Sequence, residues 1–488
     1  MTDHSLCDRV RAMCAEAEAS LRPGPFLTAV LEVRERLARD TLSVAVGGRL
    51  NAGKSTLVNA LLGQRLAPTG ATETTMVSAW FRHHHQNRIL VHFNDGRPDA
   101  EVPARPGGGV PETLGHPRES ISHITVGVTN ERLGSEFVLV DTPGRDALSA
   151  LDDYAMASIR RADALILVMP HPGADEEKAL EEFRLVMAGS RLSAANVIGV
   201  LSQIDRLGDG TAPPDEQRRI GAEVASRGAE RLKGLVCEVV PVATKLAQAA
   251  RCQAFTDKHE RALRTLATAD AQTLEDMLYS ENYLLTVALD TVPVDPATRR
   301  ELLDLLGFHG IREALAAIDA GARDLPHLLE ALRERSGINR LLDCLRERFL
   351  GSADALRADS AAALLEQALD SAEPDEQDVA ERLREQLSRL RREPELRRVE
   401  LAEVSQAHAT GDLPLNPEQA GQLQALMTGT TTAQRLGVPD ESSREELRRV
   451  AAERVGKWRV LETRLPRRAG LHATLVREIF EHLYLSLV

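Results

Sequence analysis

The sequence predicts an α/β domain built on a doubly wound mixed sheet, joined to an elongated α-helical bundle. Apolar, β-branched segments alternate with amphipathic segments between residues 42 and 250, as strands and helices do in a layered sheet. Beyond residue 250 the strand signals disappear, and Leu-, Ala-, Arg- and Glu-rich helical patterns continue to residue 488. Because 488 residues exceed what one hydrophobic core supports, more than one domain is expected.

Three regions are expected along the chain. Residues 1–41 predict two amphipathic helices at 5–21 and 26–39, residues 42–250 the α/β domain, and residues 251–488 the helical bundle. The strands of the α/β domain are predicted at 42–47, 76–82, 88–93, 121–128, 136–141, 163–169, 196–202 and 237–242. Its helices are predicted at 147–161, 175–188, 214–233 and 245–268, with a long Pro- and Gly-rich surface loop at 94–120. A final helix near 468–487 is expected to return to the N-terminal helices.

The composition restricts the class of function. A net charge of −13 and an aromatic content of 3% disfavour a nucleic-acid binder, which uses basic surface and stacking side chains. The five cysteines show neither zinc spacing nor an even disulfide count, which favours a reducing cytosol. No apolar run approaches the roughly 18 residues of a membrane span, and no secretory signal is visible. The expectation is a cytoplasmic protein that meets the inner face of the cell membrane only peripherally.

A phosphate-binding loop follows the first predicted strand. The segment 48–55 (GRLNAGKS) fits G-x-x-x-x-G-K-[ST], and an amphipathic helix follows it. Backbone N–H groups at such a helix N-terminus bind anions. Lys54 is expected to reach the β- and γ-phosphates, and the Ser55 hydroxyl to bind Mg²⁺. The candidate nucleotide contacts in this segment are Gly48, Leu50, Asn51, Ala52, Gly53, Lys54, Ser55 and Thr56.

A second motif lies at the end of the predicted strand 136–141. Asp141 and Gly144 fit D-x-x-G, in which the aspartate holds Mg²⁺ through water and the glycine N–H senses the γ-phosphate. Between the two motifs, Thr75, with Thr74 as second choice, is expected to bind Mg²⁺ in the triphosphate state, as switch residues do. The expected metal ligands are therefore Ser55, Thr75 and Asp141.

The base is assigned from two later strand ends. Residues 202–205 (SQID) stand where guanine-specific folds carry [NT]-K-x-D, so Asp205 would accept hydrogen bonds from guanine N1–H and its amine. Gln203 replaces the lysine that covers the ribose and base. Ala243 and Thr244 stand where guanine O6 is contacted. Motifs in this order predict a GTPase that converts GTP to GDP and phosphate, with Lys54, Ser55, Thr75 and Gly144 acting by positioning and charge stabilisation.

These motifs resemble those of bacterial dynamin-like GTPases. Residues 51–63 are similar to their P-loop, while 66–82 and 201–208 are similar to the isoniazid-inducible branch, its C-type member especially. The resemblance implies a helical neck built from N- and C-terminal segments, a trunk with a membrane-facing tip, and binding and remodelling of an anionic membrane. It also implies nucleotide-dependent dimerisation with a second copy or a paralogous dynamin-like chain. Leu50 departs from the family, which usually has a polar residue there.

The tip is expected in the most polar, turn-rich part of the bundle, residues 408–441. The candidate inserting residues are Leu413, Leu415, Leu423, Leu426 and Met427. Two other functions stay open. One is a GTP-gated scaffold or stress-response switch that binds a protein partner without remodelling lipid. The other is an assembly GTPase acting on ribosome or tRNA, which the acidic balance disfavours.

Overall fold

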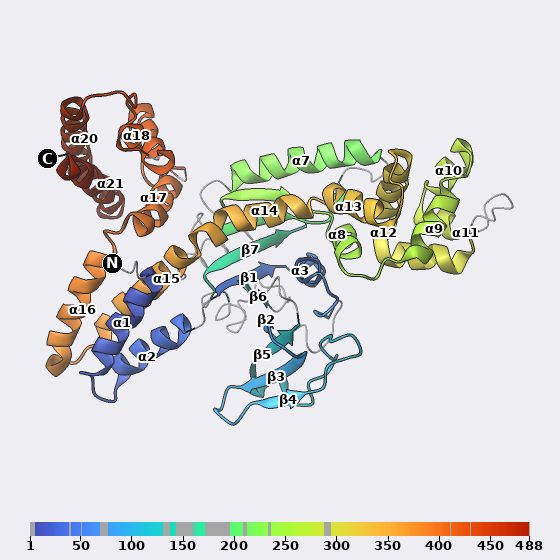
Figure 1. Ribbon diagram of the computed structural model, residues 1–488, viewed down its shortest axis with the longest axis horizontal. Helices are drawn as coiled ribbons and strands as arrows, with labels where there is room; N and C mark the ends of the chain where they lie inside the picture. The colour runs from blue at the N-terminus through green and yellow to red at the C-terminus, as the bar shows by residue number, and fades with distance from the viewer. Residues whose placement is uncertain are drawn as a thin grey trace.

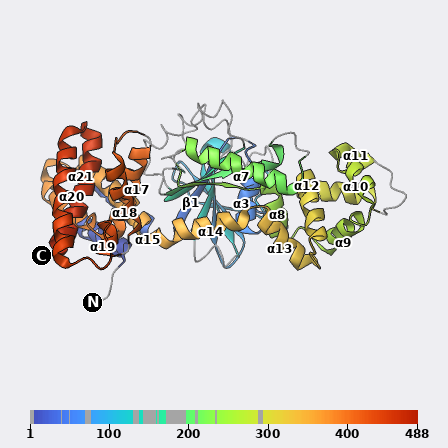
Figure 2. The same ribbon diagram turned by 90° about the horizontal axis from the view of Figure 1, so that it is seen from above.

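A computed structural model describes most of the chain. The described residues are 5–38, 41–49, 51–68, 77–129, 137–142, 159, 162–170, 196–207, 212–232, 236–286, 294–409, 411–429 and 431–487. The molecule is long, with a β-sheet near its middle and helices at both ends (Figures 1 and 2).

The central sheet is mixed, with strand order β4-β3-β5-β2-β6-β1-β7-β8-β9. Its strands are β1 (Leu42–Gly48), β2 (Ala79–His83), β3 (Arg88–Phe93), β4 (Ala100–Val102), β5 (Ile121–Val128), β6 (Phe137–Asp141), β7 (Ala164–Met169), β8 (Val197–Leu201) and β9 (Glu238–Pro241). Strands β6, β1, β7, β8 and β9 run parallel, whereas β2 pairs antiparallel with β6. The carboxyl ends of the parallel strands therefore meet at one edge, where α/β sheets bind ligands.

The predicted strands are all present, and the differences concern short elements. β4 lies inside 94–120, where a loop is expected, because three residues pair antiparallel with β3 and form the edge of the sheet. The helix expected over 245–268 is divided into α8 (Thr244–Arg251) and α9 (Asp257–Leu266), because Thr256 and His259 form a capping box that starts a new helix. The helices predicted at 147–161 and 175–188 lie outside the described residues, Ile159 excepted.

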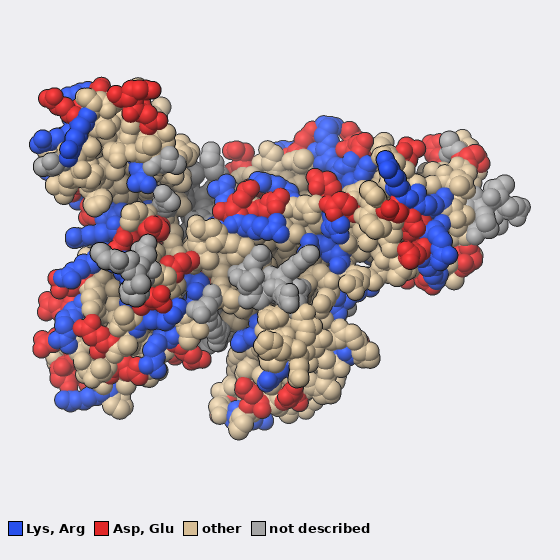
Figure 3. Space-filling model, in the orientation of Figure 1, with Lys and Arg blue, Asp and Glu red and all other residues tan. Residues whose placement is uncertain are grey.

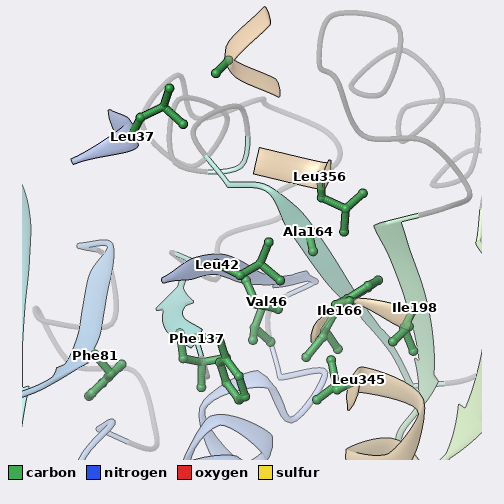
Figure 4. Packing of buried hydrophobic residues seen from close by; sticks show 14 of the residues in the cluster. Leu37, Leu42, Val46, Phe81, Phe137, Ala164, Ile166, Ile198, Leu345 and Leu356 are labelled. Carbon is green, nitrogen blue, oxygen red and sulfur yellow. The ribbon is translucent and has the colours of Figure 1, made fainter. Parts of the chain in front are cut away.

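Helices cover both faces of the parallel half of the sheet. Alternate strand residues point to opposite faces. Val46, Ile166 and Ile198 share a buried cluster with α3 (Lys54–Leu62) and α14 (Ile338–Arg348). Figure 4 shows Leu345 of α14 beside Ile166 and Ile198. The intervening strand residues, among them Ala45 and Leu165, share a second cluster with α7 (Pro214–Arg231).

The N-terminal helices belong to one end of the molecule. α1 (Leu6–Glu18) and α2 (Pro25–Leu37) pack on α15 (Ala353–Ala368), and α1 also contacts α16 (Gln377–Leu390) (Figure 1). Asp354 accepts hydrogen bonds from the backbone N–H groups of Leu6 and Cys7 at 2.7 and 3.2 Å. Such bonds satisfy donors that the first turn of α1 leaves free, and they join segments 348 residues apart.

The remaining helices fall into two groups. One group lies beyond α8, at the end of the molecule away from α1 (Figures 1 and 2). It contains α9, α10 (Ala271–Met277), α11 (Glu281–Thr286), α12 (Pro296–Asp319) and α13 (Leu325–Arg335). The other is a C-terminal unit with its own core, formed by α17 (Pro394–Ala409), α18 (Pro417–Thr428), α19 (Thr432–Arg435), α20 (Arg444–Arg464) and α21 (Arg467–Ser486). Figure 3 shows acidic and basic side chains interspersed over the helices of both groups.

The structure corrects two expectations for the C-terminal unit. Leu413, Leu423 and Leu426, expected to insert into a membrane, are only 0, 2 and 4% exposed and belong to its core. Leu415 and Met427, also expected to insert, pack partly buried against the same core. The final helix α21 packs on α20 and α17 instead of the N-terminal helices. The apolar face of α21 belongs to the same core as Trp458 of α20. The indole N–H of Trp458 donates a hydrogen bond to the Gln422 side-chain oxygen at 2.7 Å.

A partly buried carboxyl group in the first helix of this unit makes stability depend on pH. Glu400 of α17 lies 3.7 Å from Arg391, which also pairs with Asp359. Burial raises the pKa of Glu400 to about 7, although Arg391 and Arg397 lower it. A carboxyl group whose pKa is raised on folding contributes stability below pH ~4.5 that is lost as the pH rises through the folded-state pKa.

We therefore expect the free energy of unfolding to fall by about 2 kcal/mol between pH 5 and pH 8 through Glu400 alone. Urea denaturation at both pH values measures it. Glu400→Gln should reduce the fall, whereas Glu395→Gln, at an exposed position of the same helix, should not. An equal fall in both variants would contradict the assignment to Glu400.

Candidate functional site

The loop between β1 and α3 has a backbone that requires glycine. At Gly48, with φ 144°, a Cβ atom would lie 2.3 Å from the Val168 carbonyl oxygen of β7. Asn51 and Gly53 also have positive φ, 60° and 91°, and Gly53 caps the N-terminus of α3. The first N–H groups of a helix have no intrahelical partner. The loop therefore presents these donors at the carboxyl edge of the sheet, which is an anion-binding arrangement.

Two charged side chains and one hydroxyl lie at this edge. The Lys54 ammonium donates to the Arg49 carbonyl oxygen at 2.8 Å, and the Ser55 hydroxyl donates to Asp141 Oδ2 at 3.1 Å. Lys54 and Asp141 are only 6 and 9% exposed. Asp141 reaches the loop because β6 pairs in parallel with β1, with Asp141 opposite Val46.

Burial disfavours the charge on both groups. It lowers the pKa of Lys54 and raises the pKa of Asp141 to about 6, while their mutual attraction opposes each shift. The buried Oδ1 atom of Asp141 has no hydrogen-bond partner among the described residues. An unpaired carboxylate oxygen beside a serine hydroxyl fits a divalent cation with oxygen ligands, such as Mg²⁺. A buried ammonium group with one carbonyl partner fits phosphate oxygens.

Residues after β8 and β9 brace the loop. The Ser202 hydroxyl donates to the Ala52 carbonyl oxygen at 2.6 Å, and the Gln203 amide donates to the Asn51 carbonyl oxygen at 2.7 Å. Thr244 lies against the loop, since a Cβ atom on Gly53 would lie 3.1 Å from its Oγ1 atom. Gln203 thus holds the loop backbone without the positive charge of a lysine.

The structure brings most predicted site residues to this edge. They are Gly48, Asn51, Ala52, Gly53, Lys54, Ser55, Thr56, Asp141, Gln203, Asp205, Ala243 and Thr244. Asp205 lies in a short turn after β8 and is exposed, whereas Ala243 and Thr244 are buried at the start of α8. Leu50, Thr74, Thr75 and Gly144 lie outside the described residues, so their roles stay predictions.

The sequence motifs do not indicate the helical residues that contact this edge or that join the helices beside it. The Ala243 N–H donates to the Ser336 carbonyl oxygen at 2.9 Å, at the junction of α13 and α14. Glu313 of α12 is fully buried and pairs with Arg218 of α7 and, at 2.8 Å, with Arg335 of α13. These contacts join segments far apart in sequence, and no motif marks them. The one sequence signal is a glycine, Gly337, between two helical patterns.

Gly337 allows a close approach that can be tested. Its φ is 78°, and a Cβ atom would lie 2.2 Å from the Pro241 carbonyl oxygen, close to Ala243. Gly337→Ala is expected to lower the free energy of unfolding by about 3 kcal/mol or more, through backbone strain and this collision. Gly321→Ala is the matched control, because φ is 97° there but nothing lies within 4 Å, so strain alone should cost about 1 kcal/mol. Equal losses in urea denaturation would contradict the close approach.

Comparison with known proteins assigns the family. The model of the dynamin family matches residues 44–203, from β1 to Gln203. The isoniazid-induced protein IniC of Mycobacterium tuberculosis is 32% identical over 378 residues, which cover 73% of this chain and 74% of IniC. This chain belongs to the dynamin family. It is a GTPase, and membership of this family implies that it binds a guanine nucleotide.

Other dynamin-like proteins are similar over shorter stretches. Dynamin-like protein 2 of Campylobacter jejuni is 27% identical over 217 residues, 42% of this chain and 33% of that protein. Among solved structures, a chain from an oligomerised bacterial dynamin pair aligns with 87% of this chain and 79% of its own length, with 15% identity and a TM-score of 0.33. The alignment with IniC is longer than the stretch 44–203 that the family model matches.

Proposed function

We propose that this dynamin-family GTPase binds GTP with Mg²⁺, self-associates in the nucleotide-bound state, and couples this cycle to membrane binding and remodelling. The observation that carries the nucleotide part is the pair of buried groups at the loop. Burial disfavours the charges of Lys54 and Asp141, and the Oδ1 atom of Asp141 has no hydrogen-bond partner among the described residues. Mg²⁺ would satisfy this oxygen, and the oxygens of a nucleoside triphosphate would accept hydrogen bonds from Lys54.

The proposed roles follow from position. Ser55 and Asp141 would hold Mg²⁺, which offsets negative charge on the phosphates, and Lys54 would contact the β- and γ-phosphates. Asp205 would select guanine, with Ala243 and Thr244 beside the base. Thr75 and Gly144 are proposed as the residues that respond to the γ-phosphate. Hydrolysis would then depend on positioning of water and phosphate and on charge stabilisation.

The proposed coupling joins the nucleotide site at the sheet edge to the helices that follow the GTPase domain. Ser336 holds the Ala243 backbone, and Glu313 joins α12 to α7 through Arg218. From Ser336 the chain continues through α14 to α15, which packs against α1 and α2. This continuity supports a division into a GTPase domain (42–250) and a neck and trunk built from 1–41 and 251–488.

Vesicle co-sedimentation tests the membrane part. We expect more wild-type protein to sediment with anionic vesicles when a non-hydrolysable GTP analogue is present, and the nucleotide dependence to vanish in Lys54→Ala. Light scattering of the same samples without vesicles reports self-association, with a second copy or with an added paralogous dynamin-like chain. In the described part of the chain, none of the helices is both long enough and apolar enough to cross a bilayer.

The alternative is a GTP-gated scaffold that binds a protein partner and leaves lipid unchanged. One observation favours it: the leucines expected to insert into lipid, such as Leu423 and Leu426, are buried in a helical core. Normal GTP hydrolysis with no sedimentation in either nucleotide state would contradict the membrane proposal and support the scaffold.

A further inference from the structure

A buried glutamine of α7 holds the short turn that carries Asp205. Gln217 is only 2% exposed, and its side-chain amide donates hydrogen bonds to the backbone carbonyl oxygens of Ile204 and, at 3.0 Å, of Leu207. An amide nitrogen has two hydrogens, so it can hold both carbonyl groups at once. One side chain therefore fixes the backbone before and after the residue that is proposed to select guanine.

The placement of the Asp205 side chain depends on this turn. Asp205 is exposed, and within the described residues its carboxylate makes neither a hydrogen bond nor an ion pair. The residues before it are fixed: Ile204 is buried against Gly221 of α7, and the Gln203 amide donates to the Asn51 carbonyl oxygen at 2.7 Å. The backbone of the turn, and not a contact of the carboxylate itself, thus positions Asp205.

The chemistry of Gln217 indicates more than a packing role. A buried amide costs free energy unless its polar atoms are hydrogen-bonded. The Oε1 atom of Gln217 is buried and has no hydrogen-bond partner among the described residues. An apolar side chain such as methionine would fill this place without leaving a buried oxygen unpaired. The two hydrogen bonds to the turn are therefore what the amide contributes here.

α7 is fixed to its neighbours next to this glutamine. Arg218 pairs with the fully buried Glu313 of α12, and Glu313 also pairs with Arg335 of α13 at 2.8 Å. These ionic contacts hold the first turns of α7 in place beside the turn after β8. Gln217 is thus presented from a rigid element, as a group that positions another residue needs to be.

We propose that Gln217 is a positioning residue for base selection, which holds the 204–207 turn so that Asp205 can accept hydrogen bonds from guanine N1–H and the exocyclic amine. This inference rests on the proposed role of Asp205. Because Gln217 is buried, it acts through the turn and not by contact with the nucleotide. Recognition by hydrogen bonds requires placement within about 0.5 Å. A loosened turn should therefore reduce discrimination between bases more than it reduces phosphate binding.

The affinities of the full-length protein for GTP and inosine triphosphate test the proposal. Inosine triphosphate lacks the exocyclic amine but keeps N1–H and all the phosphates, so the ratio of the two affinities reports the bond from the amine to Asp205. Competition with a fluorescent GTP analogue in the presence of Mg²⁺ measures both. We expect the wild type to prefer GTP by about 10- to 100-fold, which corresponds to one hydrogen bond to a charged acceptor.

Two substitutions of Gln217 should reduce this preference. Gln217→Met keeps the length of the side chain and removes the amide, and it should lower the ratio by at least about threefold because Asp205 is misplaced. Gln217→Asn keeps an amide that is one methylene shorter, should lower the ratio in the same direction, and decides the test if Gln217→Met does not fold. Asp205→Ala should abolish the preference, and adding Gln217→Met to it should change the ratio no further.

Gln422→Leu is the matched control for a merely structural effect. Gln422 is also a buried glutamine, 5% exposed, and its side chain is bonded to Trp458 in the C-terminal unit. Its replacement should lower the melting temperature and leave the ratio of affinities unchanged. An unchanged ratio in the folded Gln217 variants, or equal weakening of both nucleotides, would overturn the inference alone. A wild-type ratio in Asp205→Ala would overturn the role of Asp205 and this inference with it.

Discussion

Lys54→Ala is expected to weaken GTP binding by at least about 100-fold, because it removes charge-assisted hydrogen bonds to phosphate worth about 1.5–3 kcal/mol each. The same change should leave the ligand-free protein as stable as the wild type. Lys54 is buried, burial lowers its pKa, and among the described residues its ammonium donates one hydrogen bond, to the Arg49 carbonyl oxygen. Without a nucleotide, the cost of burying its charge opposes the attraction to Asp141, so the net contribution to folding is expected to be small.

Titration with a fluorescent GTP analogue and thermal unfolding of the ligand-free protein measure the two effects. Lys258→Ala is the matched control, since Lys258 lies on the exposed surface of α9 and pairs with Glu301 at 2.5 Å. It should change neither quantity appreciably. Unchanged GTP affinity in Lys54→Ala would refute the site. A large loss of thermal stability would mean that Lys54 supports the fold instead of the ligand.

The sheet and the phosphate-binding loop were predictable because their chemistry restricts the residue types. A strand buried on both faces needs an uninterrupted apolar run, which residues 44–46 and 137–140 provide. The loop needs glycine at Gly48 and Gly53, where the backbone takes conformations that side chains oppose. Spacing alone therefore placed Lys54, Ser55 and Asp141 at one edge.

Tertiary contacts were not predictable in the same way. Residues 408–441 are polar and rich in turn residues, and this composition predicts where the chain turns but not which of its side chains are buried. Leu413 and Leu426 are buried because α20 and α21 cover them, far along the chain. Ser336 likewise contacts the site only because α13 and α14 pack against the end of β9, and Glu313 pairs with Arg218 only because α12 packs on α7. A single sequence has no periodic signal for contacts of this kind.

Asp141→Asn is expected to lower the GTPase activity and to raise the stability of the ligand-free protein, whereas most core substitutions lower stability. Mg²⁺-dependent GTP hydrolysis should fall by about 100-fold or more, because an amide is a poor ligand for Mg²⁺. The ligand-free variant should be more stable than the wild type by about 1–2 kcal/mol at pH 8. The wild type buries a carboxylate with an unpaired oxygen, and an amide of the same shape removes that charge.

The stability difference between the wild type and Asp141→Asn should depend on pH. The folded-state pKa of Asp141 is raised to about 6. Its contribution to stability is therefore present at low pH and is lost as the pH rises through about 6. The difference between wild type and Asp141→Asn should grow from pH 5 to pH 8 in ligand-free thermal unfolding, and Mg²⁺ with a GTP analogue should reduce it by stabilising only the wild type.

Asp163→Asn is the matched control for Asp141→Asn. Asp163 is also buried, but its carboxylate accepts hydrogen bonds from Arg36 at 2.8 Å and from the Ser43 backbone N–H and hydroxyl at 2.9 and 2.7 Å. Its replacement should destabilise the protein, since charge-assisted bonds are lost. Opposite signs for these two buried aspartates would identify Asp141 as a group held for a cation. Destabilisation by both would place Asp141 among the structural carboxylates and leave Mg²⁺ to other ligands.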